Sequence, residues 1–303
     1  MPQPALSVVI ASCVGPPFIT RCLESLERCT AALGSQGRDI EFIIVDRAGG
    51  ATASHIAERF PWARLFNRPA GASVPDLRRA GIAEARADYV AIIEEHCVAR
   101  GDWLATILRC LPERYAAIGG PIHDDAYPRI MDWAVYFTEY NSYMPPWQRG
   151  PLYNVCGANC VYRRDLMNQH LPGCSNGYWE AELNHKLLAA GEKFLSEPEL
   201  VVKHTGPFGF TYYLGQRYLF SKAFAGIRRP HVSPAFRIAY IFLAPMIVPL
   251  LMFRTASRVW SKRQHVGKFI AALPILIPVN ITYVWGEWMG YLFGPGDALT
   301  KIE

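Results

Sequence analysis

The sequence contains few charged residues and no closely spaced pair of cysteines. Charged residues make up 19% of the 303 residues and hydrophobic residues 51%, a balance that excludes an intrinsically disordered chain. None of the eight cysteines belongs to a C-x-x-C pair, so a zinc knuckle is not expected. We expect free, mostly buried thiols in a reducing compartment, which is how such cysteines usually occur.

Acidic residues are scarce in the last third of the chain. From residue 206 onward there are eleven Lys or Arg and three Asp or Glu, whereas the first 205 residues contain 20 and 23. A near-neutral body followed by a basic, apolar tail favours a membrane surface as a partner. The first 205 residues contain no basic helix and no aromatic and basic sheet motif, which disfavours nucleic acid. No secretory leader is expected either, because the apolar run 6–12 is short and no basic residue precedes it.

Apolar runs alternate with helical patterns along the first 96 residues. Strands are predicted over 6–12, 40–45, 63–67 and 89–93, and helices over 18–33, 54–60 and 74–87. A further helix is predicted over 178–190. The alternation predicts an α/β fold with a mostly parallel sheet and helices on both faces. Ligands bind at the carboxyl ends of the strands in such sheets, and Ser12, Asp46 and the segment 94–96 fall there.

The fourth predicted strand ends in two carboxylates and an imidazole, Glu94, Glu95 and His96. Two adjacent like charges repel each other, so a bound cation would explain why both are present. A solvated acidic turn is the alternative interpretation of these three residues.

The order of the motifs resembles that of the family-2 glycosyltransferases, which have the GT-A fold. In the first half the resemblance rests on the strand 6–12, on Asp46, on the helix motif 77–81 and on the strand 89–96 followed by Trp103. In the second half it rests on the segments 157–164, 179–183 and 201–206 and on Gln216 with Arg217. The resemblance covers roughly residues 6–220. It implies a GT-A-type, Rossmann-like sheet and transfer of a sugar from a nucleotide-diphosphate donor, with a UDP-sugar favoured.

The resemblance also implies roles for individual residues. Glu180 would be the catalytic base, and its alternative role is that of an acid stabilised by a helix dipole. The nucleotide would be bound by Ser12, Asp46, Arg78, Glu94, Glu95 and Arg217. The metal would be bound by Glu94, Glu95, His96 and His204, although His204 could equally be a core histidine. An imidazole ligand favours Mn²⁺ over Mg²⁺.

Three positions depart from the pattern of the family. Asp46-Arg47 stands in place of two aspartates, Glu94-x-His96 in place of Asp-x-Asp, and Glu180 in place of the usual Asp. Because two of the replacements keep an acid, we expect a working enzyme. The other two replacements, Arg47 and His96, each put a base in place of an acid.

The tail contains two uncharged apolar stretches, 238–253 and 269–285, each slightly shorter than the about 20 residues that cross a bilayer. Between them, 254–268 carries five Lys or Arg and no acid, and Arg228, Arg229 and Arg237 precede the first stretch. Because positive residues prefer the cytoplasmic side, a re-entrant or interfacial hairpin is favoured for the first stretch, whereas the second could span with tilt. Two buried core helices are the alternative. We therefore expect a GT-A domain over 1–220 and C-terminal hydrophobic membrane helices in a membrane-associating region over 221–303.

The sequence thus predicts a metal-dependent, inverting glycosyltransferase at the cytoplasmic face of a membrane. Its acceptor would be a lipid or a lipid-linked glycan, because a catalytic domain held on a bilayer meets lipid substrates in two dimensions. Two alternatives stay open. One is a synthase that moves the sugar onto a polyprenyl phosphate and needs no base. The other is a catalytically inactive GT-A domain that serves as a membrane scaffold.

Overall fold

The computed structural model describes residues 3–125, 127–174 and 177–302. The chain forms two compact units: unit 1 comprises Met1–Asp125 and Tyr143–Thr205, and unit 2 comprises Ala126–Ser142 and Gly206–Glu303. Helix α8 (Phe210–Arg228) runs without interruption through residue 220, where we expected a domain boundary. The compact units therefore divide the chain at other places, and the functional division at residue 220 stays a prediction.

Unit 1 contains an eight-stranded sheet in the order β3-β2-β1-β4-β9-β6-β10-β8. Its strands are β1 (Leu6–Ser12), β2 (Ile40–Asp46), β3 (Arg64–Asn67), β4 (Tyr89–Glu94), β6 (Ala117–Gly119), β8 (Gly150–Leu152), β9 (Asn159–Arg163) and β10 (Phe194–Ser196). The pairs β3–β2, β2–β1 and β1–β4 are parallel, whereas β9 is antiparallel to both β4 and β6. A second sheet has the order β5-β11-β7, formed by β5 (Cys97–Ala99), β11 (Val202–His204) and β7 (Ile122–Asp124).

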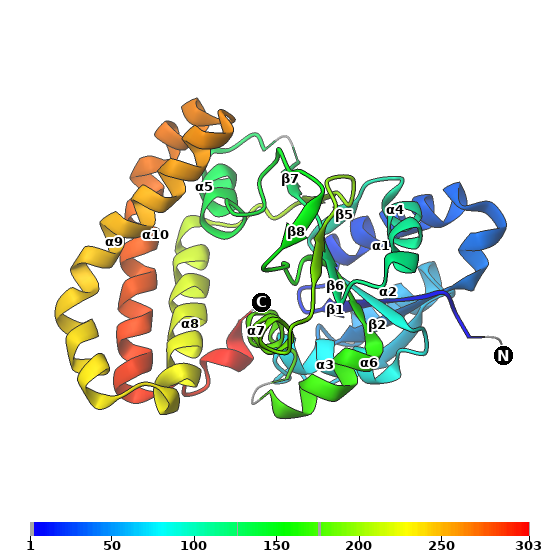
Figure 1. Ribbon diagram of the computed structural model, residues 1–303, viewed down its shortest axis with the longest axis horizontal. Helices are drawn as coiled ribbons and strands as arrows, with labels where there is room; N and C mark the ends of the chain where they lie inside the picture. Colours follow the sequence, from blue (N-terminus) through cyan, green and yellow to red (C-terminus); the bar gives the residue numbers. More distant parts are fainter. Residues whose placement is uncertain (1–2, 126, 175–176, 303) are drawn as a thin grey trace. The chain divides into compact units, whose positions relative to one another are not determined.

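Helices cover both faces of the large sheet (Figure 1). They are α1 (Phe18–Ala32), α2 (Gly50–Arg59), α3 (Val74–Glu84), α4 (Trp103–Cys110), α6 (Arg164–His170) and α7 (Glu180–Ala189). Side chains of α3, α6 and α7 form one apolar cluster with alternate residues of the strands, such as Val9 and Val45. Helices α1 and α4 lie on the other side of the sheet in Figure 1. The predicted α/β fold with a mostly parallel sheet is confirmed.

Local sequence explains why the strands and helices alternate. All seven residues of β1 are buried, which agrees with its run of β-branched residues in the middle of a parallel sheet. Helix α3 begins after Ser73, whose side chain accepts a hydrogen bond from the amide of Asp76 at 3.3 Å. Pro75 lies in the first turn of this helix. A backbone N–H there would have no intrahelical acceptor, so the N–H that proline lacks costs no hydrogen bond.

All eight cysteines are free thiols, as predicted. Six are buried, and Cys13 and Cys156 are partly exposed. Burial raises the pKa of the Cys29 thiol to about 11 and the pKa of the Cys22 thiol further still. Both residues are therefore neutral thiols at physiological pH, which fits a role in core packing.

Asn159 connects β9 to three other segments of unit 1. Its side-chain oxygen accepts a hydrogen bond from Trp103 Nε1 at 2.9 Å. Its side-chain nitrogen donates to the carbonyl oxygens of Leu200 at 2.7 Å and Pro121 at 3.3 Å. Asn159 is fully buried, so these bonds replace all contact of its amide with water.

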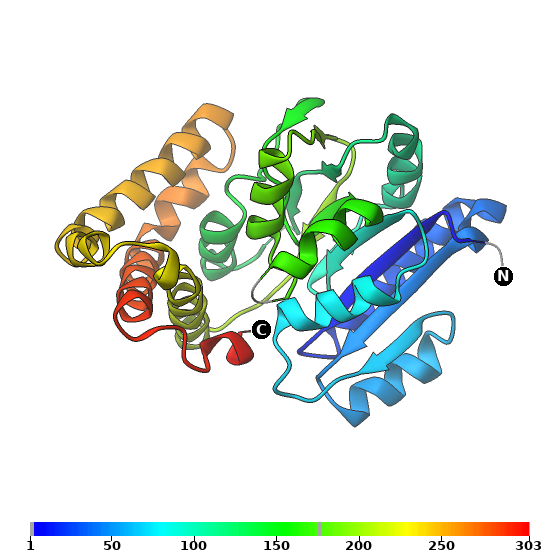
Figure 2. The same ribbon diagram turned by 60° about the horizontal axis from the view of Figure 1, so that its bottom comes forward.

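Unit 2 is helical and contains α5 (Ile130–Glu139), α8, α9 (Pro234–Lys262) and α10 (Val266–Phe293). Helix α10 contacts each of the other three helices. Both views show α9 and α10 side by side as a hairpin (Figures 1 and 2). An ion pair between Arg228 and Glu287, at 2.7 Å, joins α8 to α10, and the Tyr240 hydroxyl of α9 donates to the same carboxylate.

Two segments, Phe242–Lys262 and Val266–Phe293, are long and apolar enough to cross a membrane by length and composition. Many of their large apolar side chains are exposed. On α9 these include Phe242, Met246 and Phe253, and on α10 they include Ile277, Ile281 and Trp285. This exposure argues against two fully buried core helices, although α10 also buries residues such as Phe269, Leu276 and Val279.

We expect Asn159→Ala to destabilise unit 1 by about 2–4 kcal/mol, because it leaves the indole N–H and two carbonyl groups buried without their partner. The measurement is the midpoint of chemical unfolding followed by tryptophan fluorescence. Asn67→Ala, at the exposed end of β3, is the matched control and should change stability by less than about 0.5 kcal/mol. Equal effects of the two substitutions would contradict this role of Asn159.

Candidate functional site

The carboxyl ends of β1 and β2 bring Ser12 and Asp46 together. The two residues are register partners, and Ser12 Oγ donates a hydrogen bond to Asp46 Oδ1 at 2.6 Å. The second oxygen of Asp46 accepts from the amide of Gly49 at 3.2 Å. Both side chains are buried, so here Asp46 fixes the turn between β2 and α2. Their predicted role in nucleotide binding stays a prediction.

Arg47 occupies the position where the resembling family has a second acid. Its Nη1 donates to the carbonyl oxygen of Ala72 at 2.6 Å, and its backbone amide donates to the carbonyl of Ser12 at 2.9 Å. Only 7% of Arg47 is exposed. The guanidinium thus connects the end of β2 to the loop before α3, which gives the unusual base a structural role.

Three charged residues from separate elements meet near the end of β4. Arg78 of α3 lies between two carboxylates, with its Nη2 2.7 Å from Glu94 Oε1 and its Nη1 3.6 Å from Glu180 Oε2. The Arg78 side chain is 8% exposed, whereas those of Glu94 and Glu180 are 30% and 31% exposed. Burial lowers the pKa of Arg78, but Glu94, Glu180 and other nearby groups together raise this pKa by more, so the guanidinium is charged. We refer to these three residues as the Glu94–Arg78–Glu180 bridge.

Glu95 points elsewhere and holds the loop between β1 and α1. Its Oε1 accepts hydrogen bonds from the amides of Cys13 at 2.7 Å and Val14 at 2.9 Å, and its Oε2 accepts from Gly15 at 3.3 Å. Gly15 has a φ of +86°, and a Cβ there would lie 2.5 Å from Thr52 Oγ1. Burial raises the pKa of Glu95 to about 7 against the opposing effect of the three amides.

His204, at the end of β11, lies near His96, which directly precedes β5. Their ring centroids are 6.1 Å apart, and the His96 ring also packs against Phe18 at 4.4 Å. Thr205 binds the backbone carbonyl of His96 through both its amide, at 2.7 Å, and its hydroxyl, at 2.8 Å. Burial, together with His96, lowers the pKa of His204 to about 3, so that this imidazole is neutral.

The four predicted metal ligands are not arranged as one protein-only metal site. Among the residues that the structure describes, no three His, Cys, Asp or Glu side chains are grouped to hold an ion. Glu94 faces Arg78, Glu95 faces backbone amides, and His96 packs against an aromatic ring. Taken together, this set does not fit a single ion as it stands.

Glu180 is the first residue of α7, where the positive end of the helix dipole stabilises an acid. Glu182 lies on another side of this helix and pairs with Lys186 at 3.1 Å. Arg217, the remaining predicted nucleotide ligand, belongs to unit 2. It pairs there with Glu139 at 3.6 Å and stacks on Tyr283 at 4.9 Å, with a side chain that is 12% exposed.

Gly157 is a site residue whose function the sequence did not indicate. A Cβ at this position would lie 2.8 Å from Arg78 Nη1 and 3.1 Å from Glu180 Oε2. A side chain at this position would therefore force Arg78 Nη1 to shift. The sequence signal was its place in the segment 157–164, one of those on which the resemblance rests.

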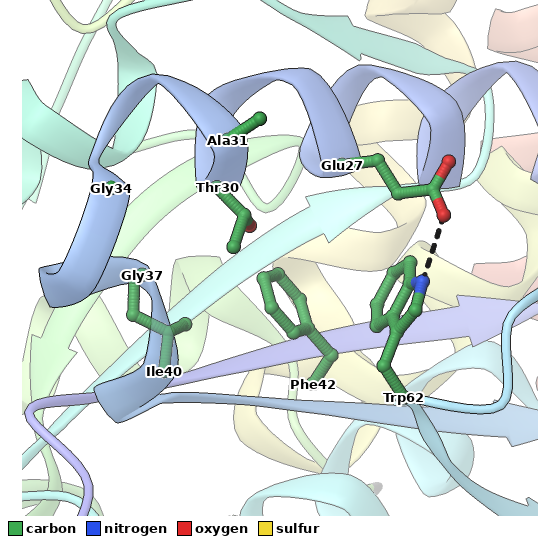
Figure 3. A pocket seen from close by; sticks show the side chains of 8 residues that line it. All are labelled: Glu27, Thr30, Ala31, Gly34, Gly37, Ile40, Phe42 and Trp62. Atoms are coloured by element: carbon green, nitrogen blue, oxygen red, sulfur yellow. Dashed lines mark hydrogen bonds between the residues drawn. The ribbon is translucent and has the colours of Figure 1, made fainter.

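A separate pocket of about 530 Å³ lies at the other end of β2 (Figure 3). It is lined by residues of α1, by Ile40 and Phe42, and by Trp62, whose indole donates to Glu27 at 2.9 Å. None of the predicted site residues lines this pocket.

We expect Glu95→Ala to expose the amides of Cys13, Val14 and Gly15 to hydrogen exchange. Loss of the carboxylate removes their acceptor, so exchange at these amides should accelerate by about tenfold or more, whereas the amides of β2 keep their protection. The measurement is native-state hydrogen exchange resolved to single residues. Unchanged protection at 13–15 would show that Glu95 does not hold this loop.

Comparisons with known proteins agree with this architecture. The family description Glycosyl transferase family 2 matches residues 7–171. Among solved structures, the chain is similar to the mannosyltransferase PcManGT from Pyrobaculum calidifontis, in complex with GDP-Man and Mn²⁺. The TM-score is 0.54 at 16% identity, over 97% of this chain and 88% of that one, which supports a GT-A fold. No curated protein sequence matches significantly. The family match spans more than half of the chain and includes the strands that carry Ser12, Asp46 and Glu94, so this protein belongs to glycosyl transferase family 2.

Proposed function

We propose that this chain is an inverting glycosyltransferase that uses a nucleotide-sugar donor and a divalent metal. Its acceptor would be a lipid or a lipid-linked glycan at the cytoplasmic face of a membrane. The observation that carries the proposal is the Glu94–Arg78–Glu180 bridge, which places two part-exposed carboxylates at the carboxyl end of β4 in a family-2 chain. Ligands of parallel α/β sheets bind at this edge.

In the proposed reaction Glu180 acts as the general base. The acceptor hydroxyl attacks the anomeric carbon from the side opposite the leaving group, and its proton passes to the Glu180 carboxylate. A carbon–oxygen bond to the acceptor forms while the bond to the diphosphate breaks, and the nucleoside diphosphate leaves with the electron pair. Glu180 suits this role because it is ionisable, part-exposed and fixed by Arg78 at the start of α7.

The donor and the metal are the less specific parts of the proposal. A UDP-sugar is favoured by the resemblance of the sequence, whereas the similar mannosyltransferase is in complex with GDP-Man. We therefore treat UDP- and GDP-sugars as the two candidate donors. Mn²⁺, or Mg²⁺, would supply positive charge to the leaving diphosphate. Because the predicted ligands do not form one site, Glu94 is the part-exposed carboxylate best suited to contact such an ion.

The membrane part of the proposal rests on the α9–α10 hairpin of unit 2. Exposed apolar side chains cover much of both helices, and Arg254, Arg258 and Lys262 follow at four-residue intervals along one side of α9. The described carboxylates of unit 2 have basic partners elsewhere: Asp132 pairs with Arg129, Glu139 with Arg217, Glu287 with Arg228, and Asp297 with Lys301. Apolar surface beside concentrated positive charge is typical of binding to anionic lipid.

One alternative function differs only in the acceptor. A polyprenyl phosphate is already ionised, so its transfer reaction would not need Glu180 as a base. The inactive scaffold is motivated by two departures, Arg47 and Glu94-x-His96, and it loses part of this motivation because Arg47 has a structural role.

We expect Glu180→Gln to lower the rate of sugar transfer by about a hundredfold or more, because the amide cannot accept the proton. The assay is transfer of labelled sugar from UDP-glucose or GDP-mannose to a total lipid extract in micelles, with Mn²⁺ or with a chelator. Glu182→Gln is the matched control and should retain nearly full activity, since Glu182 pairs with Lys186. An unchanged rate for Glu180→Gln would favour the phosphate acceptor, and a wild-type protein without transfer would favour the scaffold.

We expect the full chain to float with vesicles of phosphatidylcholine and phosphatidylglycerol and to bind pure phosphatidylcholine vesicles more weakly. Each basic residue near an anionic surface contributes about 1 kcal/mol, so the triple variant of Arg254, Lys262 and Lys268 to Gln should bind anionic vesicles about a hundredfold more weakly. The measurement is the partition between vesicles and solution in a density gradient.

The control for this experiment removes the same charge from unit 1. A triple variant of the exposed residues Arg28, Arg79 and Arg114 to Gln should bind as the wild type does. A wild-type chain that stays at the bottom of the gradient, or equal losses in both triple variants, would contradict a specific role of the hairpin.

A further inference from the structure

Arg78 connects three elements of unit 1 that are far apart in the sequence. It projects from α3 and reaches Glu94 at the end of β4 and Glu180 at the start of α7. A backbone hydrogen bond from the Tyr178 amide to the Pro75 carbonyl, at 3.0 Å, joins the same two helical segments beside it. The position of Glu180 is therefore determined by α3 as well as by its own helix.

The surroundings of the guanidinium limit where it can move. The central carbon of the guanidinium, Cζ of Arg78, lies 5.9 Å from the centre of the buried Tyr178 ring. On another side Gly157 approaches so closely that a side chain there would collide with Nη1. A planar group suits this space, because its two terminal nitrogens face the two carboxylates separately, whereas a lysine has a single nitrogen.

The charges of the bridge depend on one another. One guanidinium faces two carboxylates, so the removal of Arg78 leaves two acids close together without their shared cation. Like charges in a partly buried site repel each other, and the less restrained side chain turns toward solvent. Glu180, at 31% exposure and with the longer contact of 3.6 Å, is the side chain freer to turn away.

We propose that Arg78 is a positioning residue that holds the base Glu180 in its reactive orientation relative to Glu94. This inference rests on the proposed function and differs from the nucleotide contact that the sequence suggested for Arg78. Under this proposal Arg78 couples Glu94 to the base Glu180, so that substitutions at Arg78 act through Glu180.

A double-mutant cycle tests this coupling. We expect Arg78→Met to lower turnover by about a hundredfold with less than about a threefold change in the KM of the donor, because a displaced base slows the chemical step only. In the Glu180→Gln background the same substitution should lower turnover by at most about threefold, since the group it positions is already lost. The full-length protein, the two donors and the lipid extract are those of the transfer assay above.

Two further variants keep the test valid if Arg78→Met does not fold. Arg78→Lys retains the charge but should restore only part of the turnover, because a single nitrogen lacks the fixed fork that faces the two carboxylates separately. Gly157→Ala retains all three charged residues but displaces the guanidinium. It should therefore lower turnover by about tenfold with an unchanged KM of the donor. Thermal unfolding of each variant shows whether it is folded.

The outcomes separate this inference from the proposed function. No transfer by the wild-type protein with either donor overturns the proposed function and this inference with it. Transfer by the wild type, with effects of Arg78→Met and Glu180→Gln that multiply, overturns the positioning role alone. A large rise in the KM of the donor for Arg78→Met, with unchanged turnover, also overturns the positioning role and assigns Arg78 to nucleotide binding.

Discussion

The parallel register of β1 with its two neighbours is the constraint on which the site depends. Ser12 is paired with Asp46 across β1 and β2, and Ala11 is paired with Glu94 across β1 and β4. Because parallel strands end at the same edge, three strands bring their polar ends together there, and the loops after them start from one place. The buried seven-residue run of β1 fixes this register, since a shift by one residue would turn every side chain to the other face.

The large elements of unit 1 could be predicted from the sequence because their patterns are local. Strands β1 and β4 and helix α1 begin at the predicted residues, since an apolar run or a helical spacing determines each of them. Side-chain partners could not be predicted in the same way, because they depend on elements that are distant in the sequence. The pairing of Arg78 with Glu94 and Glu180 needs the packing of α3 against the sheet, and no short-range pattern contains that information.

The segment 94–96 shows that adjacent polar residues can have different partners in the fold. Three consecutive polar residues predicted one metal site, but β4 ends at Glu94, and Glu95 and His96 lie in the turn that follows. Glu94 therefore reaches Arg78, whereas Glu95 reaches the loop after β1 from the other side. The carboxylate that is best buried, Glu95, is also the one engaged by three amides. The charge of this motif stabilises the fold as well as the site.

The same distinction between charge and position applies to Glu180. A carboxylate at the start of a helix is stabilised by the dipole wherever it occurs, so its place on α7 alone does not make it a base. Glu182 has nearly the same place in the sequence, yet it pairs with a lysine of its own helix. Of these two acids, Glu180 faces a guanidinium from another element that is itself held by a second carboxylate. The chemical difference between the two acids thus arises from Arg78 and from the space that Gly157 leaves beside it.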